Sequence, residues 1–113
     1  MELEVELKAL EITQLRVVAA DSQAGHGTGA NSAASILKIK GTELQQALTE
    51  MVVELAGPEG LAMRPEAHGA NAPLADGWIE AAAPYYFNMR KVSIFGGSNE
   101  IQRNIVAKTV LGL

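Results

Sequence analysis

The residues best placed to do chemistry lie between positions 86 and 105, where polar side chains surround two adjacent glycines. Gly96 and Gly97 interrupt a helical pattern, and Ser98 follows as a good helix N-cap because its hydroxyl can accept a hydrogen bond from a first-turn N–H. Glu100 adds a negative charge to that turn. Free backbone N–H groups, glycines without side chains and the positive end of a helix dipole are the parts of a cradle for an anion or a cofactor.

Other glycines and both histidines give weaker signals. The spacing Gly25-x-Gly27-x-x-Ala30 is similar to a dinucleotide-binding fingerprint. That motif works at a strand-to-helix turn, whereas a helix is expected to precede it here, so a helix–helix loop is the simpler interpretation. His26 and His68 lie far apart in glycine-rich segments, without converging ligands. This favours solvated histidines, and no metal site is expected.

Basic and aromatic side chains outside the glycine junction are interpreted structurally. Two basic pairs, Lys38 with Lys40 and Arg90 with Lys91, are typical of solvated helix faces. The aromatic run at 85–87 could line a pocket, although packing in a core is the simpler account.

Composition places the chain among ordinary globular domains or pieces of one. Its 113 residues are 48% hydrophobic and 19% charged, with a net charge of −4 and no cysteine. Disorder, a disulfide framework and a thiolate metal site are therefore excluded, and no apolar run approaches the length of a membrane span. Nine scattered basic residues disfavour nucleic acid as a partner. The acidic start lacks an apolar signal core, so a cytoplasmic location is expected.

The periodicity of apolar residues predicts an all-α fold, an incomplete antiparallel bundle of about four helices, because no β alternation of useful length occurs. The expected helices cover 1–20, 31–55, 85–95 and 99–111, with a long irregular connection at about 57–83. Pro84 suits the first turn of the third helix. Gly41 interrupts the second helix and is interpreted as a point of close helix–helix approach.

The first helix carries apolar residues on two faces. One face has Leu3, Leu7, Leu10, Val17 and Val18. The other has Val5, Ile12 and Ala19, with Leu15 between the two. A helix that is apolar on two faces is usually buried on both. Because no N-cap residue precedes it either, the chain is expected to begin inside a longer helix and to need a neighbour, which self-association would supply.

Three separated stretches resemble the acyl-CoA dehydrogenases. Residues 95–104 are similar to the closing signature of that family, near the end of its C-terminal helical domain. Residues 37–46 resemble the third-to-last long helix of the family, and residues 106–113 resemble its terminus. Because the stretches agree in order, residues 1–113 together are identified as a fragment of that C-terminal domain.

The resemblance implies a flavoenzyme. Members of the family bind FAD between a middle β-domain and the C-terminal bundle, and the bundles build dimer or tetramer contacts. Their substrates are acyl-CoA thioesters: a carboxylate base removes the α proton while a hydride leaves to the flavin, which gives a trans-2-enoyl thioester. Electrons then pass to an electron-transfer flavoprotein. The implied partners are therefore acyl-CoA, that flavoprotein and further copies of the chain.

The resemblance also assigns site residues by position. Ser98, Asn99 and Glu100 match the stretch that contacts FAD at the N-terminus of the last helix. Gly97 matches a residue beside the thioester, and Phe95 matches an aromatic position that lines the flavin and acyl pocket.

Two stretches depart from the family pattern. Glu54 and Gly57 belong to a turn that corresponds to one reaching the FAD of a neighbouring subunit, but Glu54 replaces a glutamine there and Pro58 removes a backbone N–H donor. Gly96 stands where many members carry the glutamate base. Other members place the base on the first helix of the domain, which is expected to precede Met1, so no residue of this chain is expected to be catalytic.

Two functions follow from the sequence. In the first, the chain supplies part of the FAD site and the oligomer contacts of a complete dehydrogenase, and is inactive by itself. In the alternative, it is a stand-alone helical interaction module without catalysis. A search for a flavin-contacting β-domain encoded upstream of Met1 would separate them.

Overall fold

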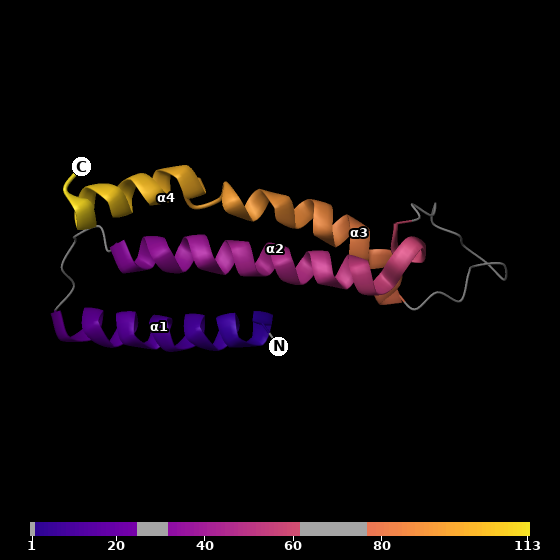
Figure 1. Cartoon of the computed structure of the whole chain (residues 1–113), viewed down its shortest axis with the longest axis horizontal. Coiled ribbons are helices and arrows are strands. Elements are labelled where there is room, and N and C mark those ends of the chain that lie inside the picture. The colour runs from indigo at the N-terminus through magenta and orange to yellow at the C-terminus, as the bar shows by residue number, and fades with distance from the viewer. Residues whose placement is uncertain (1, 25–31, 62–76) are drawn as a thin grey trace. The chain divides into compact units, whose positions relative to one another are not determined.

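A computed structural model describes residues 2–24, 32–61 and 77–113. Its α-helices are α1 (Glu2–Ala24), α2 (Ser32–Gly60), α3 (Gly77–Met89) and α4 (Asn99–Val106) (Figure 1). A 3₁₀ helix, η1 (Arg90–Ser93), and a π-helical turn, η2 (Ala107–Leu111), complete the elements. No strand occurs in the described ranges, which confirms the expected all-α class. None of these helices is long and apolar enough to cross a membrane.

Contacts divide the chain into two compact units. One comprises Met1–Gln45 with Lys91–Leu113, and the other comprises Gln46–Arg90. The long helix α2 contributes residues to both units.

In the first unit, α1 and the first half of α2 run antiparallel. Leu10 of α1 is the side chain nearest to Gly41 of α2. Val17 and Ala20, later in α1, line a depression together with Ala33, which lies earlier in α2. Later residues of α1 thus meet earlier residues of α2.

Helix α4 also runs antiparallel to α2. Its first residue, Asn99, bonds to Lys38 and Thr42 of α2. Residues 106, 107 and 111, at and after the end of α4, line a depression with the earlier α2 residues 36 and 39.

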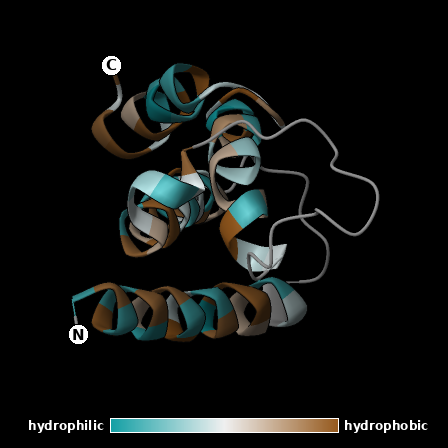
Figure 2. Cartoon of the chain, turned by 90° about the vertical axis from the view of Figure 1, so that its right-hand side faces the viewer, coloured by the Kyte–Doolittle hydropathy of each residue, from teal (hydrophilic) through white to brown (hydrophobic). Residues whose placement is uncertain are grey.

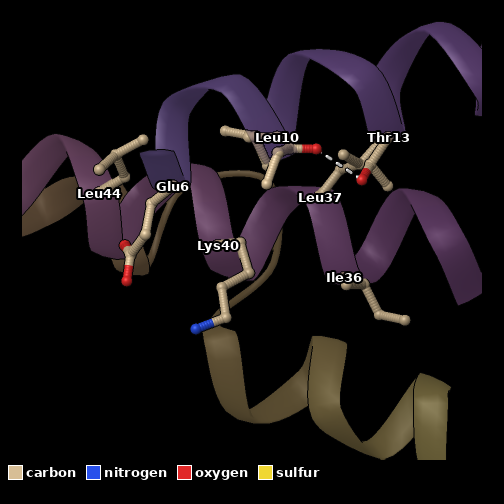
Figure 3. A pocket seen from close by; sticks show the side chains of 8 residues that line it. Glu6, Leu10, Thr13, Ile36, Leu37, Lys40 and Leu44 are labelled. Atoms are coloured by element: carbon tan, nitrogen blue, oxygen red, sulfur yellow. Dashed lines mark hydrogen bonds between the residues drawn. The ribbon is translucent and has the colours of Figure 1, made fainter. Parts of the chain in front are cut away.

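The contact between α1 and α2 is open rather than tight. A cavity of about 250 Å³ lies between the two helices (Figure 3). Its lining consists of Glu6, Ala9, Leu10, Thr13, Ile36, Leu37, Lys40 and Leu44. A Cβ added to Gly41 would lie 3.8 Å from Leu10 Cδ2, an ordinary van der Waals distance. The interpretation of Gly41 as a point of close approach is therefore wrong, since the site has room for a methyl group.

Helix α1 carries apolar residues on more than one side, and hydrophobic and hydrophilic stretches alternate along its ribbon in Figure 2. The partly buried stripe is narrower than the sequence predicted, with Leu3, Leu10 and Val17 spaced seven residues apart. Leu7 and Val18, expected on the same face, are exposed because the helix meets α2 along one stripe only. Val5 and Ile12 of the predicted second apolar face are also exposed, as is Leu15 between the two faces, and all three are more than half accessible.

In the second unit, α2 bends near its end. Gly57 has φ 62° and ψ −156°, which is not a helical conformation, and Pro58 then starts one further turn. The regular part of the helix therefore ends close to the predicted residue 55. A Cβ on Gly60 would lie only 2.5 Å from Ala56 Cβ of the same helix, so the bend after Gly57 requires glycine here, whereas Ala82 Cβ of α3, at 3.8 Å, would be in ordinary contact.

Helix α3 begins earlier than predicted, at Gly77 instead of Tyr85, and Pro84 lies inside it. An interior proline forfeits one helical hydrogen bond, a cost of about 3 kcal/mol. Burial of Ala82 and Ala83 offsets part of that cost, because these small, strongly helix-forming residues pack in the core of the unit. The irregular connection predicted at 57–83 is correspondingly shorter, and residues 62–76 lie outside the described ranges.

Two glycine-to-alanine substitutions in α2 should change stability in opposite directions. Gly60→Ala should lower the free energy of unfolding by about 1–3 kcal/mol, because neither Cβ of the clashing pair can rotate away. Gly41→Ala should raise it by about 0.5–1 kcal/mol, because a helix-interior glycine gains helix propensity where a methyl group has room. Equilibrium urea unfolding of both variants measures the two effects. Destabilisation by Gly41→Ala would contradict the open packing of α1 on α2.

Candidate functional site

The candidate site is the turn between η1 and α4, residues 94–98. Gly96 and Gly97 have φ values of 66° and 86°, in the left-handed region that side chains disfavour, so both positions suit glycine. Ser98 is the N-cap of α4, and its Oγ accepts a hydrogen bond from the backbone N–H of Ile101 at 3.4 Å. The predicted glycine break and serine N-cap are thus both present.

Gln102 closes the turn from the side of α4. Its Nε2 donates a hydrogen bond to the Gly96 carbonyl at 3.0 Å. A Cβ on Gly97 would lie only 2.9 Å from the same nitrogen, whereas a Cβ on Gly96 would meet nothing within 4 Å. The turn is therefore filled on the Gly97 side by a side chain of its own helix and open at Gly96.

A polar network from α2 holds the first residue of α4. Asn99 is only 6% exposed, and its Oδ1 accepts a hydrogen bond from Lys38 Nζ at 2.7 Å. Its Nδ2 donates to Thr42 Oγ1 at 3.2 Å, while that hydroxyl donates to the Ile39 carbonyl at 2.9 Å. Lys38 Nζ donates a second bond to the Ser93 carbonyl at 3.1 Å. The side chain of Asn99 thus binds α2, and what it leaves for a ligand is its backbone N–H.

The prediction of a solvated face is wrong for Lys38 and correct for Lys40. Lys40 is exposed and pairs with Glu43 at 3.3 Å, a surface contact of small energy. Lys38 is partly buried because it points to the opposite side of α2, where polar residues continue at Ser35 and Thr42. This stripe of polar residues at helical spacing is the sequence signal that could have identified Lys38 as a buried partner.

Arg90 is likewise partly buried, in the unit Gln46–Arg90. Its guanidinium lies 4.3 Å from the centroid of the Tyr86 ring and donates to the Gln46 carbonyl at 3.0 Å. Gln46 in return donates to the Arg90 carbonyl at 3.1 Å. The predicted solvated face is therefore wrong for Arg90. Lys91 is exposed, and its ammonium lies 5.5 Å from the centroid of the Phe95 ring.

Glu100 carries its negative charge at the N-terminus of α4. The pKa of this carboxyl lies below its usual 4.5 because the carboxylate accepts hydrogen bonds from its own backbone N–H and from Ser98, with a smaller contribution from the charge of Arg103. The side chain is exposed, with Arg103 Nη1 at 3.8 Å. A ligand that approaches this turn therefore meets a fixed anion, which repels a phosphate but can accept hydrogen bonds from hydroxyl groups.

The remaining predicted site residues differ in their surroundings. Phe95 is exposed beside Gly96, together with Ile94, so an apolar surface adjoins the open side of the turn. Glu54 and Gly57 belong to the other unit, where Glu54 is exposed in α2. Their predicted contact with a neighbouring subunit's FAD stays a prediction.

The predicted helix–helix loop at residues 25–30 and the predicted solvated histidines, His26 and His68, fall on positions outside the described residues. In the parts of the chain that the structure does describe, no group of three or more potential metal ligands occurs.

Comparison with known proteins decides the family. The model of the acyl-CoA dehydrogenase C-terminal domain matches residues 1–111, nearly the whole chain. The chain belongs to this family. Both the stretch at 37–46 and the stretch at 95–104, on which the sequence resemblance rests, lie within the match, so the resemblance is confirmed.

One curated relative of this acyl-CoA dehydrogenase domain is "Acyl-CoA dehydrogenase IpdE1" of Mycobacterium tuberculosis (strain ATCC 25618 / H37Rv). It is 38% identical over 66 residues, which cover 58% of this chain. The same stretch spans 14% of the length of that relative. No solved structure matches the chain.

The lowered pKa of Glu100 predicts a pH-dependent contribution to stability. A carboxyl whose pKa is lower in the folded state stabilises the fold above its unfolded pKa, and this contribution is lost as pH falls through the folded pKa. Glu100→Gln should therefore be less stable than the wild type at about pH 6, and the difference should shrink towards about pH 3. Urea unfolding at a series of pH values measures it, with Glu50→Gln, an exposed glutamate of α2, as the control for lost charge. A difference that stays constant with pH would contradict the assignment.

Proposed function

We propose that this domain supplies the α4 side of an FAD site in an acyl-CoA dehydrogenase that introduces a trans-2 double bond into acyl-CoA thioesters. The observation that carries the proposal is the turn itself, two left-handed glycines followed by a serine N-cap, in a chain of this family. The proposed partners of the complete enzyme are an acyl-CoA substrate, an electron-transfer flavoprotein and further copies of the chain.

The groups at the turn suit the hydroxyl-bearing part of FAD. The first N–H groups of any α-helix have no acceptor within the helix, and Ser98 adds a hydroxyl. Glu100 supplies an ionised acceptor, which favours a ribose or ribityl hydroxyl as its partner over the pyrophosphate. Gly96 leaves open space on the outer side of the turn, so a ligand can approach the backbone closely. Ser98, Asn99 and Glu100 are therefore the residues that would hold the cofactor.

The residues before the N-cap face the substrate in this proposal. Bound FAD would supply the hydride acceptor. Gly97 would lie beside the thioester, and the exposed ring of Phe95 would cover the apolar side of the pocket and exclude water. Gly96 has no side chain and cannot remove the α proton, so the carboxylate base comes from another part of the enzyme. This domain alone should for that reason be inactive.

The proposal predicts that the Ser98 hydroxyl contributes to FAD affinity. In the complete FAD-loaded enzyme, Ser98→Ala should raise the Kd for FAD by about 2- to 10-fold, because one hydrogen bond to the ligand is lost. Ser98→Thr keeps both the hydroxyl and the N-cap and should restore affinity. Ser22→Ala removes an exposed serine hydroxyl that bonds only to the Ala19 carbonyl and serves as the control. FAD titration followed by fluorescence measures each Kd, and equal values for Ser98→Ala and wild type would contradict the proposal.

The exposed face of α1 supports the proposed oligomer contact, and it also favours the alternative function, an interaction module without catalysis. Ile12 is 58% exposed and Leu15 is 69% exposed. Covering such a side chain contributes about 1.5–3 kcal/mol each. FAD binding by the complete protein separates the two functions, because a module without catalysis would bind none.

Ile12 and Leu15 are accordingly predicted to hold copies of the chain together. Sedimentation at micromolar concentration should show an oligomer for the wild type and dissociation for Ile12→Asp or Leu15→Asp, because a carboxylate would be buried in the contact. Gln14→Asp introduces the same carboxylate at an exposed polar position of α1 and controls for charge. A stable wild-type monomer with cooperative unfolding would contradict this contact.

A further inference from the structure

The ammonium group of Lys38 bridges the two ends of the glycine turn. Lys38 Nζ donates to the carbonyl of Ser93, the last residue of η1, at 3.1 Å. It also donates to Oδ1 of Asn99, the first residue of α4, at 2.7 Å. Only residues 94–98 lie between these two acceptors, and they include both glycines with positive φ. One side chain of α2 thus fixes where the turn begins and where it ends.

The Thr42 hydroxyl is a second donor within reach of Asn99 Oδ1, at 3.3 Å. It has a single proton, and the Ile39 carbonyl at 2.9 Å is its nearer acceptor, so it replaces the Lys38 ammonium only in part. A hydrogen bond from an ammonium group is about twice as strong as one between neutral groups. Loss of the Lys38 ammonium would therefore leave the buried Asn99 oxygen without its strongest donor and would release one end of the turn.

Three further hydrogen bonds of the turn are local. Gln102 binds the Gly96 carbonyl from within α4, and the N–H groups of Ile94 and Phe95 bind the Lys91 carbonyl at the end of η1. These bonds shape each end separately, and none of them joins the end of η1 to the start of α4. Glycine has the largest conformational freedom to lose, so a turn with two of them needs such an external tie to hold one geometry.

We propose that Lys38 is the positioning residue of this site: it sets the geometry of the Gly96–Gly97 turn and of the first N–H groups of α4 that would contact FAD. Lys38 acts through Ser93 and Asn99 and does not itself touch the ligand. The first half of this inference concerns the geometry of the turn, and the second half, the contact with FAD, rests on the proposed function.

Lys40 offers a matched control for the proposal. It lies two residues away on the same helix, carries the same charge and is exposed. Its ammonium pairs with Glu43, at 3.3 Å, and with no group of the turn. Removal of either lysine therefore changes the charge of α2 equally, and only removal of Lys38 changes the support of the turn.

The test compares Lys38→Met with Lys40→Met in the complete enzyme by two readouts. Amide hydrogen exchange of residues 96–100 reports the geometry of the turn, and FAD titration reports binding. Lys38→Met should accelerate exchange at these amides and raise the Kd for FAD about tenfold, whereas Lys40→Met should change neither. If Lys38→Met does not fold, Lys38→Gln, which keeps an uncharged donor, is measured by the same two readouts.

Three other results would overturn the inference in whole or in part. Unchanged exchange at residues 96–100 in Lys38→Met would show that Lys38 does not position the turn, whatever happens to FAD. Accelerated exchange with an unchanged Kd would show that the turn is positioned by Lys38 but does not bind FAD, which overturns the proposed function together with the second half of the inference. A fall in melting temperature alone, without either change, would mark Lys38 as a merely structural residue.

Discussion

The hydrogen bonds of the Lys38 ammonium lie where one helix ends and the next begins, and the candidate site depends on them. Every helix end leaves backbone groups without partners in the helix, and the break between η1 and α4 brings two such ends together. Lys38 binds one end through the Ser93 carbonyl and the other through Asn99. The two glycines can then adopt left-handed conformations in a turn whose ends are fixed, so the start of α4 is held in one geometry.

Sequence patterns predicted the elements that depend on local chemistry. The glycine pair and Ser98 specify a break and an N-cap whatever surrounds them, and both are present. The start of α3 could not be predicted in the same way. Pro84 suits a first turn by local rules, but tertiary burial of Ala82 and Ala83 favours a helix that begins at Gly77, eight residues before the predicted Tyr85. Packing that involves distant residues outweighed the local preference.

The partners of side chains were the hardest feature to predict. Lys38 and Lys40 are two residues apart in similar sequence surroundings, yet one binds a buried amide and the other a surface carboxylate. What separates them is a helical rotation of about 200°, which places Lys38 against the turn and Lys40 towards solvent. The breadth of the apolar surface of α1 was predictable from spacing, whereas the narrow stripe that meets α2 was not. That stripe leaves Ile12 and Leu15 exposed, which connects the fold to the proposed oligomer contact.

The central claim is that the preorganised start of α4 holds the cofactor. A crystal structure of the complete protein with FAD bound tests it most directly. We predict hydrogen bonds of about 3 Å between FAD oxygens and the Ser98 hydroxyl, the Glu100 carboxylate or the backbone N–H of Asn99, with Lys38 still bound to Ser93 and Asn99. An FAD molecule bound elsewhere, with residues 96–100 open to solvent, would contradict it.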